Sequence, residues 1–576
     1  MSKIELFLKT EKTWLEEYWK CINQGFINLY NKETEQYEKT PLIVGYEMKQ
    51  EIKKLINDLK NPRYIYDTTE NDKRIKRKEN LCFQGKAPFY MQPIQMMLHQ
   101  KTFWEVIYSF KMSDTKKRRF RKILLLVSRK NGKSTDMAAD ANVDLFFGEG
   151  GVDICCFSND DKTASLIWNE IKGMRKRLDP ESEITSDNLQ VIKNDEKNIN
   201  IFKMSEKTQS KDGRNIDKSY GDEIHDMKTT EIIDANWQSM SIKDEPLLIM
   251  LTTEGVLNDM TLDNELKYAR GVLNDEIDDE RYLPFLFTQD SESEIFKDKW
   301  SWCKSNPSLI YGVKKWEFLE DMMVKAKHQK SSKITMLCKD FNIKQNSATA
   351  WLDYEDYEYE QVKVPLSDFK GCYAFAGVDL AATTDLSAVA LILMKPNDNR
   401  KYVYTKYFVP ETKLDTDKEG GAKYHDWQEK EYIEVHEGNI VSLHKIAEWF
   451  KWLYEQGIII YKLGYDLRFA TDFLNEMDKY GYKSSKNGTC EMILQSKYVM
   501  STPMKHLEAD LKSQLVHGLS EMDKWCLSNV ALKVDGTELI MAEKMKTDRR
   551  IDGAVALILA YAIFQRYESD YKRSLK

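Results

Sequence analysis

The sequence predicts an α/β fold in two parts: a mostly parallel sheet around a phosphate-binding loop, then a mixed sheet. The first observation is a buried apolar run at residues 123–127, which ends in a polar loop and Gly132-Lys133-Ser134 before a helical pattern. The second is the alternation of strand and helix patterns from about residue 121 to 255. The third is a run of strands separated by short turns from residue 372 on, typical of an antiparallel meander.

Length, charge and cysteine content bound the class of protein. At 576 residues the chain is long enough for two or more domains with separate cores. The net charge of −7 argues against a uniformly basic nucleic-acid-binding surface but allows a local basic channel. Nine cysteines without C-x-x-C pairs indicate reduced thiols, and Cys155-Cys156 lies in an apolar run that suggests core. Neither a signal-peptide pattern nor a bilayer-length apolar stretch occurs, so we expect no membrane segment.

Residues 1–80 are predicted to form a helical appendage that packs on the next domain. Trp14, Tyr18, Ile22, Phe26 and Leu29 recur at the spacing of one helical face, and a second helix is predicted over residues 44–59.

Two basic runs follow, at residues 71–80 and 115–122. We favour solvated loops for both, because a run of like charges is most often a solvated surface. The second run directly precedes the apolar strand, so contact with a polyanion is the alternative.

The loop at residues 128–135 is the centre of the first part. Its context suits phosphate, because loop amides and a helix N-terminus attract phosphate oxygens. Lys133 is expected to reach the terminal phosphates and Ser134 to ligate Mg²⁺. The usual first glycine falls at Val127, so an ordinary strand-to-helix turn is the alternative. The expected nucleotide-binding residues are Gln95, Ser128, Arg129, Lys130, Asn131, Gly132, Lys133, Ser134 and Thr135.

Asp222 and Glu223 supply the acidic pair that a P-loop ATPase needs at a neighbouring strand end. Asp222 would hold Mg²⁺ through water or through Ser134, and Glu223 would orient and polarise the attacking water. Residues 217–221 are less apolar than a typical central strand, and Asp-Glu pairs are frequent in an acidic chain, so a chance pair is the alternative.

Two further segments suit the same site, which is expected at the carboxyl ends of the strands. Residues 246–254 predict a buried strand that ends in Thr252-Thr253, where helicase-like motors carry a hydroxyl that senses the γ-phosphate. Gln95 lies upstream of the loop, where in several P-loop motors a glutamine amide reads the adenine edge by donating and accepting together.

The second part carries three aspartates that a sheet would bring to one edge. Asp379 ends the first meander strand, Asp466 ends a separate buried strand over residues 458–467, and Asp552 opens a final helix over residues 551–564. Such a cluster would hold two divalent cations, which activate water and stabilise the leaving oxygen of a phosphodiester. Asp385 follows the first strand closely and is either a further member or a loop cap.

In this order and spacing, the motifs resemble the large subunit of a tailed-bacteriophage terminase over roughly residues 80–566. In the first part the resemblance rests on residues 92–95, 128–134, 222–225 and 251–253. Residues 302–307 and 351–352 resemble the family's segment between domains. In the second part it rests on residues 377–380 with 385–387, and on 465–466, 500–503 and 550–556.

The resemblance implies a packaging ATPase followed by a ribonuclease H-like endonuclease, with ATP and Mg²⁺ as cofactors and Mg²⁺ or Mn²⁺ at the nuclease. It implies double-stranded concatemeric DNA as substrate, and a small terminase subunit and the procapsid portal as partners. Several copies would form a ring on the portal, docked transiently in the cytoplasm of the host bacterium. Glu223 would be catalytic, and Asp379, Asp466 and Asp552 would ligate the nuclease metals. Arg129 would stabilise charge in the loop, with a salt bridge that braces the loop as its alternative role.

The expected domains are residues 1–80 for the appendage, 81–285 for the ATPase core, 286–365 for a lid or linker, and 366–576 for the nuclease. A P-loop repair helicase fused to a nuclease is one alternative, but no second motor-like block follows Thr253. A nucleotide-regulated structural adaptor with a degenerate site is another, and the intact Lys133, Ser134, Asp222 and Glu223 argue against it.

Overall fold

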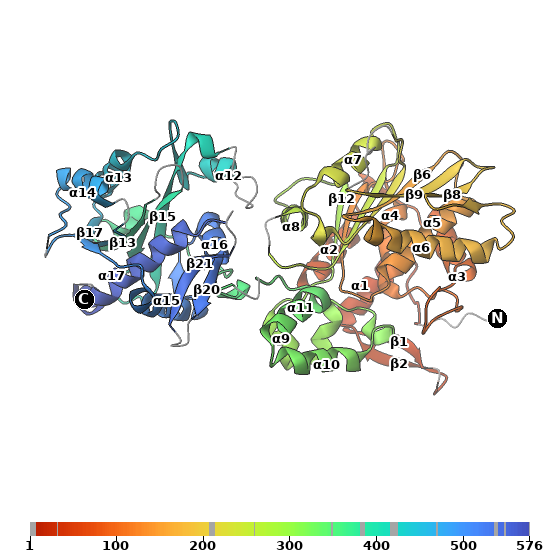
Figure 1. Ribbon diagram of the computed structural model, residues 1–576. Helices are drawn as coiled ribbons and strands as arrows, with labels where there is room; N and C mark the ends of the chain where they lie inside the picture. Colours follow the sequence, from red (N-terminus) through yellow and green to blue (C-terminus); the bar gives the residue numbers. More distant parts are fainter. Residues whose placement is uncertain are drawn as a thin grey trace. The chain divides into compact units, whose positions relative to one another are not determined.

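The computed structural model divides the chain into two compact units, residues 1–345 and 346–576 (Figure 1). The residues that it describes are 7–31, 33–206, 214–257, 260–346, 350–380, 386–414, 424–467, 470–485, 487–534, 539–545 and 549–574.

The first unit is built on an eight-stranded sheet in the order β12-β5-β11-β10-β6-β9-β8-β7. The parallel strands are β5 (Lys122–Leu126), β6 (Asp153–Ser158), β9 (Ile199–Ser205), β10 (Lys218–Asp222), β11 (Leu247–Thr252) and β12 (Tyr282–Leu286). At one edge, β8 (Val191–Asn194) and β7 (Ser186–Asp187) pair antiparallel. The prediction of a mostly parallel sheet is confirmed.

Helices cover both faces of this sheet (Figure 1). On one side lie α4 (Leu98–Ser109), α5 (Lys133–Phe147) and α6 (Asp161–Leu178), and on the other α7 (Glu231–Ser239) and α8 (Thr261–Leu273). Successive residues of β5 enter opposite cores: Leu125 faces α4 and α5, and Leu124 faces α7 and α8. A strand buried on both faces must be apolar at every position, which explains the run at residues 123–127.

The N-terminal region is helical only in part. Helix α1 (Trp14–Gln24) ends at Gly25, whose φ of 75° is the left-handed conformation that glycine adopts most easily. The chain then forms the hairpin of β1 (Phe26–Asn31) and β2 (Gln36–Pro41). The prediction that Phe26 and Leu29 continue the helical face is therefore wrong. The second helix is confirmed as α2 (Tyr46–Asp58); beyond it β3 (Tyr64–Tyr66) pairs with β4 (Phe110–Met112).

Each of the two basic runs places two of its cations inside the protein. The first lies in helix α3 (Thr69–Leu81), where Arg74 and Lys78 are buried. In the second, Arg118 and Arg119 are buried, and Arg119 pairs with Asp58 at 2.7 Å. For these four side chains the solvated-loop prediction is wrong, and for Arg118 and Arg119 the polyanion alternative is wrong as well.

Arg74 and Lys78 belong to a buried charge network along one face of α5. It joins three basic and three acidic side chains, Arg74, Lys78, Lys218, Asp136, Asp140 and Asp144. Asp140 is central, because Arg74 approaches it at 3.2 Å and Lys218 at 2.9 Å. The network ties α3 and the start of β10 to the helix that follows the phosphate-binding loop.

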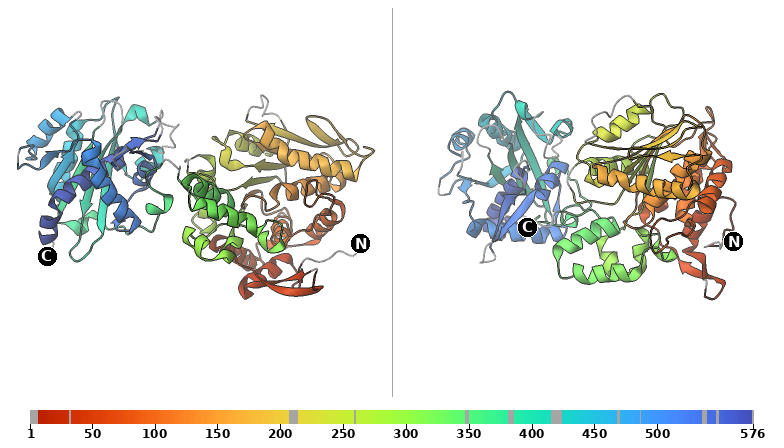
Figure 2. Two further views of the ribbon diagram at one scale, coloured as in Figure 1. Left: turned by 60° about the horizontal axis from the view of Figure 1, so that its bottom comes forward. Right: turned by 45° about the vertical axis from the view of Figure 1, so that its right-hand side comes forward.

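After β12 the chain forms a small helical layer, residues 292–341, which we call the helical segment (Figure 2, in green). It contains α9 (Glu292–Lys297), α10 (Trp316–Ala326) and α11 (Lys330–Phe341), with short 3₁₀ turns at Lys299–Lys304 and Leu309–Tyr311. Trp302 stacks on Trp316 with ring centroids 6.0 Å apart, which joins α10 to the 3₁₀ turn at Lys299–Lys304.

The second unit holds a seven-stranded mixed sheet in the order β16-β15-β14-β13-β17-β18, with β19 beside β15. Its strands are β13 (Tyr373–Asp379), β14 (Ser387–Leu393), β15 (Lys401–Pro410), β16 (Ile433–His436), β17 (Ile459–Tyr465), β18 (Cys490–Met492) and β19 (Val516–His517). β13, β14 and β15 pair antiparallel, which confirms the predicted meander. β17 joins β13 in parallel.

Helices also cover both faces of the second sheet. α13 (Leu443–Glu455) and α14 (Ala470–Lys479) lie on one side, and α15 (Lys497–Lys512), α16 (Glu521–Ser528) and α17 (Asp552–Ser574) on the other. The unit also contains α12 (Tyr424–Glu429), the hairpin of β20 (Val530–Val534) and β21 (Ile540–Lys544), and short 3₁₀ turns at Tyr354–Asp356, Leu366–Phe369 and Glu411–Lys413. In the described part of the chain, no helix has the length and apolar character needed to cross a bilayer.

Candidate functional site

Three parallel strand ends meet at the carboxyl edge of the first sheet. β11 lies between β5 and β10, and the registers place Thr252 beside Leu126 and Asp222 beside Leu251. Neighbouring strands are about 4.8 Å apart. The structure therefore brings the loop after β5, the acidic end of β10 and the threonine end of β11 into one site.

The loop after β5 turns into α5 through two left-handed residues. Lys130 has a φ of 65° and Gly132 a φ of 86°. Glycine is favoured at position 132 for two reasons. It adopts the positive φ easily, and a Cβ there would lie only 3.2 Å from the side-chain nitrogen of Gln100.

The Lys133 side chain closes the loop on itself. Its ammonium donates a hydrogen bond to the carbonyl oxygen of Val127 at 2.7 Å, at the position of the usual first glycine. Desolvation lowers the pKa of Lys133 to about 8, against the opposing charges of Glu223 and Asp222. The ammonium is thus charged at neutral pH, and the acidic pair is close enough to stabilise that charge.

The loop is braced by the helical segment. The backbone nitrogen of Ser128 donates to Ser305 at 3.3 Å, and that of Ser308 donates to the Asn131 side chain at 3.1 Å. The Ser128 hydroxyl donates to the Asn306 side chain and accepts from Asn131 at 2.9 Å. Ser128 and Asn131 are both buried, so their side chains, predicted to bind nucleotide, are engaged within the protein.

The brace continues inward through a buried lysine. Lys314 donates to the Asn306 side chain at 2.7 Å and pairs with Asp340 at 2.8 Å. Burial lowers the pKa of Lys314, and Asp340 opposes that shift. Asn306 in turn donates to the backbone oxygen of Asp340 at 2.7 Å. The loop is therefore connected to α11 through satisfied polar contacts.

Asp222 and Glu223 differ in protonation behaviour although they are adjacent. Burial and the charge of Glu223 raise the pKa of Asp222 to about 6. Burial also acts to raise the pKa of Glu223, but His225 and Lys133 outweigh it and lower that pKa to about 2. The Ser134 hydroxyl lies 3.4 Å from Asp222, as expected for two groups on one metal. Glu223 has a φ of 53°, which turns the chain away from the strand.

The polar composition of β10 is explained by partners distant in sequence. Lys218 belongs to the buried charge network, and the Ser219 hydroxyl donates to the Asn236 side chain at 2.9 Å. A Cβ at Gly221 would lie 2.5 Å from the ring of Phe157, so glycine permits close packing there. β10 is fully buried despite its sequence.

His225 joins Glu223 to Thr252 and was not singled out by the sequence. Its Nδ1 lies 3.1 Å from a Glu223 oxygen and 3.3 Å from the Thr252 hydroxyl, which also accepts from the His225 backbone nitrogen at 3.2 Å. Thr253 is buried, and its hydroxyl has no hydrogen-bond partner among the described residues. His225 could have been identified in the sequence from its position two residues after Glu223.

The side chains of Arg129 and Lys130 are exposed at the mouth of the loop. Neither makes an ion pair or a side-chain hydrogen bond within the described part of the chain. The bracing salt bridge considered for Arg129 is therefore absent there, and the guanidinium is available to a ligand. Thr135 is half-buried in the first turn of α5.

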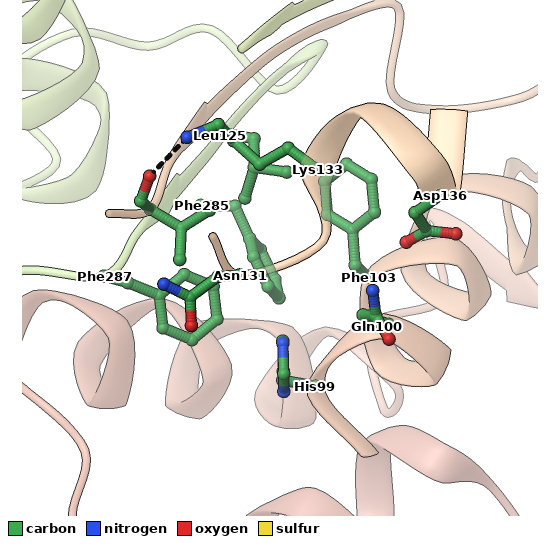
Figure 3. Close-up of a pocket in the computed structure, with 10 residues that line it drawn as sticks. His99, Gln100, Phe103, Leu125, Asn131, Lys133, Asp136, Phe285 and Phe287 are labelled. Atoms are coloured by element: carbon green, nitrogen blue, oxygen red, sulfur yellow. Dashed lines mark hydrogen bonds between the residues drawn. The ribbon is translucent and has the colours of Figure 1, made fainter. Parts of the chain in front are cut away.

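A small cavity of about 20 Å³ lies behind the loop (Figure 3). His99 points into it beside Phe103 and Phe287, and burial lowers the pKa of His99 to about 3, so the ring is neutral. A space of this size holds a single water and not a purine ring.

The two glutamines upstream of the loop are placed differently. Gln95 is exposed, and its side chain makes no hydrogen bond within the described residues. Gln100 lines the cavity (Figure 3). Its side-chain oxygen accepts a hydrogen bond from the Met97 backbone nitrogen at 3.0 Å, and its amide nitrogen lies next to Gly132. Gln100, which the sequence analysis did not select, is the glutamine beside the loop.

In the second unit, two of the predicted aspartates follow neighbouring strands. β13 and β17 are parallel, with Val378 opposite Tyr465, so Asp379 and Asp466 stand at the same level of the carboxyl edge. Both side chains are half-buried.

Asp552 approaches that edge from the first turn of α17. A Cβ at Gly553 would lie 2.0 Å from the Tyr407 hydroxyl, and one at Gly377 would lie 2.0 Å from the Ala556 oxygen, so α17 contacts the sheet directly. Tyr407 is level with Asp379, because both pair with Ala388. The helix therefore begins at the level of Asp379.

The described residues alone do not complete a metal cage. Among them, no group of three or more His, Cys, Asp or Glu side chains is arranged to hold a metal ion. Asp385 lies outside the described residues, as does the rest of 381–385. The chemistry of the carboxylates at the ends of β13 and β17 nevertheless fits a hard divalent cation.

Comparison with known proteins matches both units. The family described as terminase large subunit, ATPase domain, matches residues 99–271, and terminase large subunit, endonuclease domain, matches residues 276–568. Protein YmfN of Escherichia coli K12 is 22% identical over 367 residues, which cover 61% of this chain and 77% of YmfN.

Two solved structures are also similar. The large terminase of bacteriophage HK97 is 20% identical with a TM-score of 0.43, covering 86% of this chain and 100% of that one. A large terminase from a thermophilic bacteriophage, in complex with ATP-γ-S, is 12% identical with a TM-score of 0.28, covering 76% of this chain and 93% of that one. The endonuclease match alone spans more than half of the 576 residues. This chain therefore belongs to the terminase large subunit family and carries the ATPase and endonuclease domains of that family.

Proposed function

We propose that this chain is a DNA-packaging motor and nuclease. ATP hydrolysis in the first unit would drive double-stranded viral DNA into a procapsid, and endonucleolytic cutting by the second would release it from a concatemer. The observation that supports the motor best is the meeting of Lys133, Asp222, Glu223 and Thr252 at one sheet edge.

ATP would bind on the open side of the loop, with its phosphates at the N-terminus of α5. Lys133 would exchange its bond to Val127 for the terminal phosphates. Ser134 and Asp222 would hold Mg²⁺, which would neutralise phosphate charge when bound. Arg129, exposed and without a protein partner in the described part, would stabilise charge on the transferred group. Gln95, which is exposed and without a protein partner in the described part, would contact the adenine edge.

Glu223 would orient and polarise the attacking water, a role that needs the ionised carboxylate at neutral pH. His225 would fix the position of Glu223 relative to Thr252, so that loss of the γ-phosphate would alter the contacts at the end of β11. Thr252 and Thr253 would pass that change on to the moving part of the motor.

At the nuclease edge, Asp379, Asp466 and Asp552 would hold two divalent cations, Mg²⁺ or Mn²⁺. These ions would supply a nucleophilic water and stabilise the leaving oxygen. The role of the chain is to fix the carboxylates on rigid strand ends and on a helix start.

The family supports DNA as the substrate of both activities. We propose a small terminase subunit and the portal of the procapsid as partners, with several copies in a ring on the portal in the host cytoplasm. The boundaries at residues 80, 285 and 365 remain predictions, with the helical segment as the proposed lid.

Two variants test the motor. Lys133→Ala should lose nucleotide binding, because the fixed cation at the phosphates is removed. Glu223→Gln should bind ATP but lose at least about a hundredfold in hydrolysis, since an amide cannot act as the base. Wild-type hydrolysis by Glu223→Gln would refute its catalytic role.

ATP hydrolysis with and without duplex DNA, and nicking of supercoiled plasmid in Mg²⁺ or Mn²⁺, test the two activities together. A structural adaptor would show neither activity. A repair helicase would also unwind a short duplex, and a terminase would not.

A further inference from the structure

The end of α11 is fixed against the phosphate-binding loop. The Arg129 backbone nitrogen donates to the carbonyl oxygen of Lys339 at 3.1 Å. One turn later Asn342 ends the helix with a φ of 51°, accepts from the Glu254 nitrogen at 3.0 Å, and donates to Phe287 at 2.8 Å. The loops after β5, β11 and β12 thus hold Lys339 at the edge of the ATPase site.

The side chain of Lys339 is unusual within the helical segment. Its ammonium makes no ion pair and no hydrogen bond within the described part of the chain, although the residue is half-buried. What sets Lys339 apart is that it is not exposed, since the other buried or half-buried lysines in or beside the segment all have carboxylate partners: Lys304, Lys314, Lys333 and Lys344.

The charges around Lys339 are those of the ATPase site. Burial lowers its pKa; Asp226 and Glu223 oppose that shift, and Arg129 adds to it. Conversely, the charge of Lys339 helps to lower the pKa of Glu223. A half-buried cation at the edge of this site, close enough to Glu223 for their charges to interact and without a direct partner in the described part, can receive an anion from outside the protein.

We propose that Lys339 binds the terminal phosphate of a nucleoside triphosphate and so makes the helical segment sense that phosphate directly. This inference rests on the proposed ATPase function of the same site. Lys133 would approach the phosphates from α5 and Lys339 from α11, on the side of Arg129. A nucleoside diphosphate lacks the group that Lys339 would contact, so the residue should separate ATP from ADP.

The experiment measures affinity for two nucleotides by isothermal titration of the full chain in Mg²⁺. Lys339→Ala should weaken binding of the non-hydrolysable analogue AMP-PNP by about tenfold or more, as expected for a lost charge-assisted hydrogen bond. Its affinity for ADP should stay within about twofold of wild type. Lys339→Arg, which keeps the charge, should retain the preference for AMP-PNP.

Lys327→Ala is the matched control. Lys327 is an exposed lysine in the turn between α10 and α11, at the opposite end of the helix. The rise of α11 places it roughly 14 Å or more from Lys339. Lys327→Ala removes one positive charge from the same segment and should leave the affinities for AMP-PNP and ADP unchanged.

The results separate the inference from the function on which it rests. If Lys339→Ala leaves the ratio of the two affinities unchanged, or lowers both equally, Lys339 is structural and the proposal fails. Lys339→Gln, with a neutral polar side chain, gives the same decision should the alanine variant misfold. If wild type binds neither nucleotide, or Lys133→Ala binds both as wild type does, the proposed ATPase site is what fails.

Discussion

Replacing Asp140 with asparagine should destabilise the first unit by about 3–5 kcal/mol, the usual effect of removing one partner of a buried ion pair. Asp140 is fully buried; Arg74 approaches it at 3.2 Å and Lys218 at 2.9 Å, and the hydroxyls of Tyr108 and Tyr220 donate to it at 2.9 and 3.0 Å. Asparagine keeps the shape but removes the charge and turns one acceptor into a donor.

The magnitude follows from the charges of the network. Three cations face three aspartates there, so the substitution leaves one buried cation uncompensated. Burial acts to raise the pKa of Asp140, but Arg74, Lys218 and Lys78 outweigh it and hold that pKa well below its usual range. Because the folded pKa is depressed, the contribution of Asp140 is fully present above its unfolded pKa of about 4. It is lost only as the pH falls through the lower folded value, so pH 7 shows the whole effect.

Urea unfolding monitored by hydrogen exchange in α5 and β10 measures the change. Asp195→Asn is the matched control, since Asp195 pairs with Lys193 on the surface and should contribute less than about 1 kcal/mol. The double variant Asp140→Asn/Lys218→Met should be less destabilised than the sum of the singles by about 2 kcal/mol. A change under about 1 kcal/mol for Asp140→Asn, or strict additivity in the double variant, would refute the reasoning.

Three further predictions concern activity. The pH profile of kcat/KM for ATP hydrolysis should be bell-shaped: the pKa of about 6 at Asp222 sets the acid limb, and the pKa of about 8 at Lys133 sets the basic limb. A flat profile across both values would contradict these roles. Arg129→Lys keeps the charge but loses the planar guanidinium, so turnover should fall about tenfold or more, and unchanged turnover would remove Arg129 from the site. The nuclease variants are Asp379→Asn, Asp466→Asn and Asp552→Asn. Each should stop nicking plasmid in Mg²⁺ or Mn²⁺ yet still hydrolyse ATP, because the two sites lie in separate units. If all three variants still cut plasmid, these residues are not the metal ligands.

The core of the first sheet could be predicted because its cause is local. A strand buried on both faces must be apolar throughout, and residues 123–127 satisfy that rule without reference to the rest of the chain. β10 does not, because Lys218 and Ser219 are satisfied by Asp140 and Asn236, which only the fold brings near. The helical spacing of Phe26 and Leu29 misled for a similar reason, since it continues past the glycine where α1 ends.

The same distinction applies to the candidate site. Lys133, Ser134, Asp222 and Thr252 lie in short motifs at strand ends, where spacing alone indicates a role. Gln100, Asn306 and Lys339 reach the loop from separate elements, and no local pattern marks them. The basic run at residues 71–80 was misjudged although its partners were visible in the sequence. Three aspartates recur every four residues on the helix after the loop, a polar stripe that calls for buried cations: Asp136, Asp140 and Asp144.

The contacts between the loop and the helical segment set a lower limit on the size of an ATPase fragment that can be made by truncation. In a fragment that ends with β12 at Leu286, Ser128 and Asn131 would lose their hydrogen bonds to Asn306 and Ser308. The Arg129 backbone nitrogen would also lose its acceptor. Each buried polar group left unmet costs about 1–3 kcal/mol, so several together would rearrange the loop. Ending the fragment after Gln345, where the first unit ends, keeps every one of these partners. Separating the two activities for biochemical work therefore requires a cut near residue 346, well beyond the last strand of the sheet.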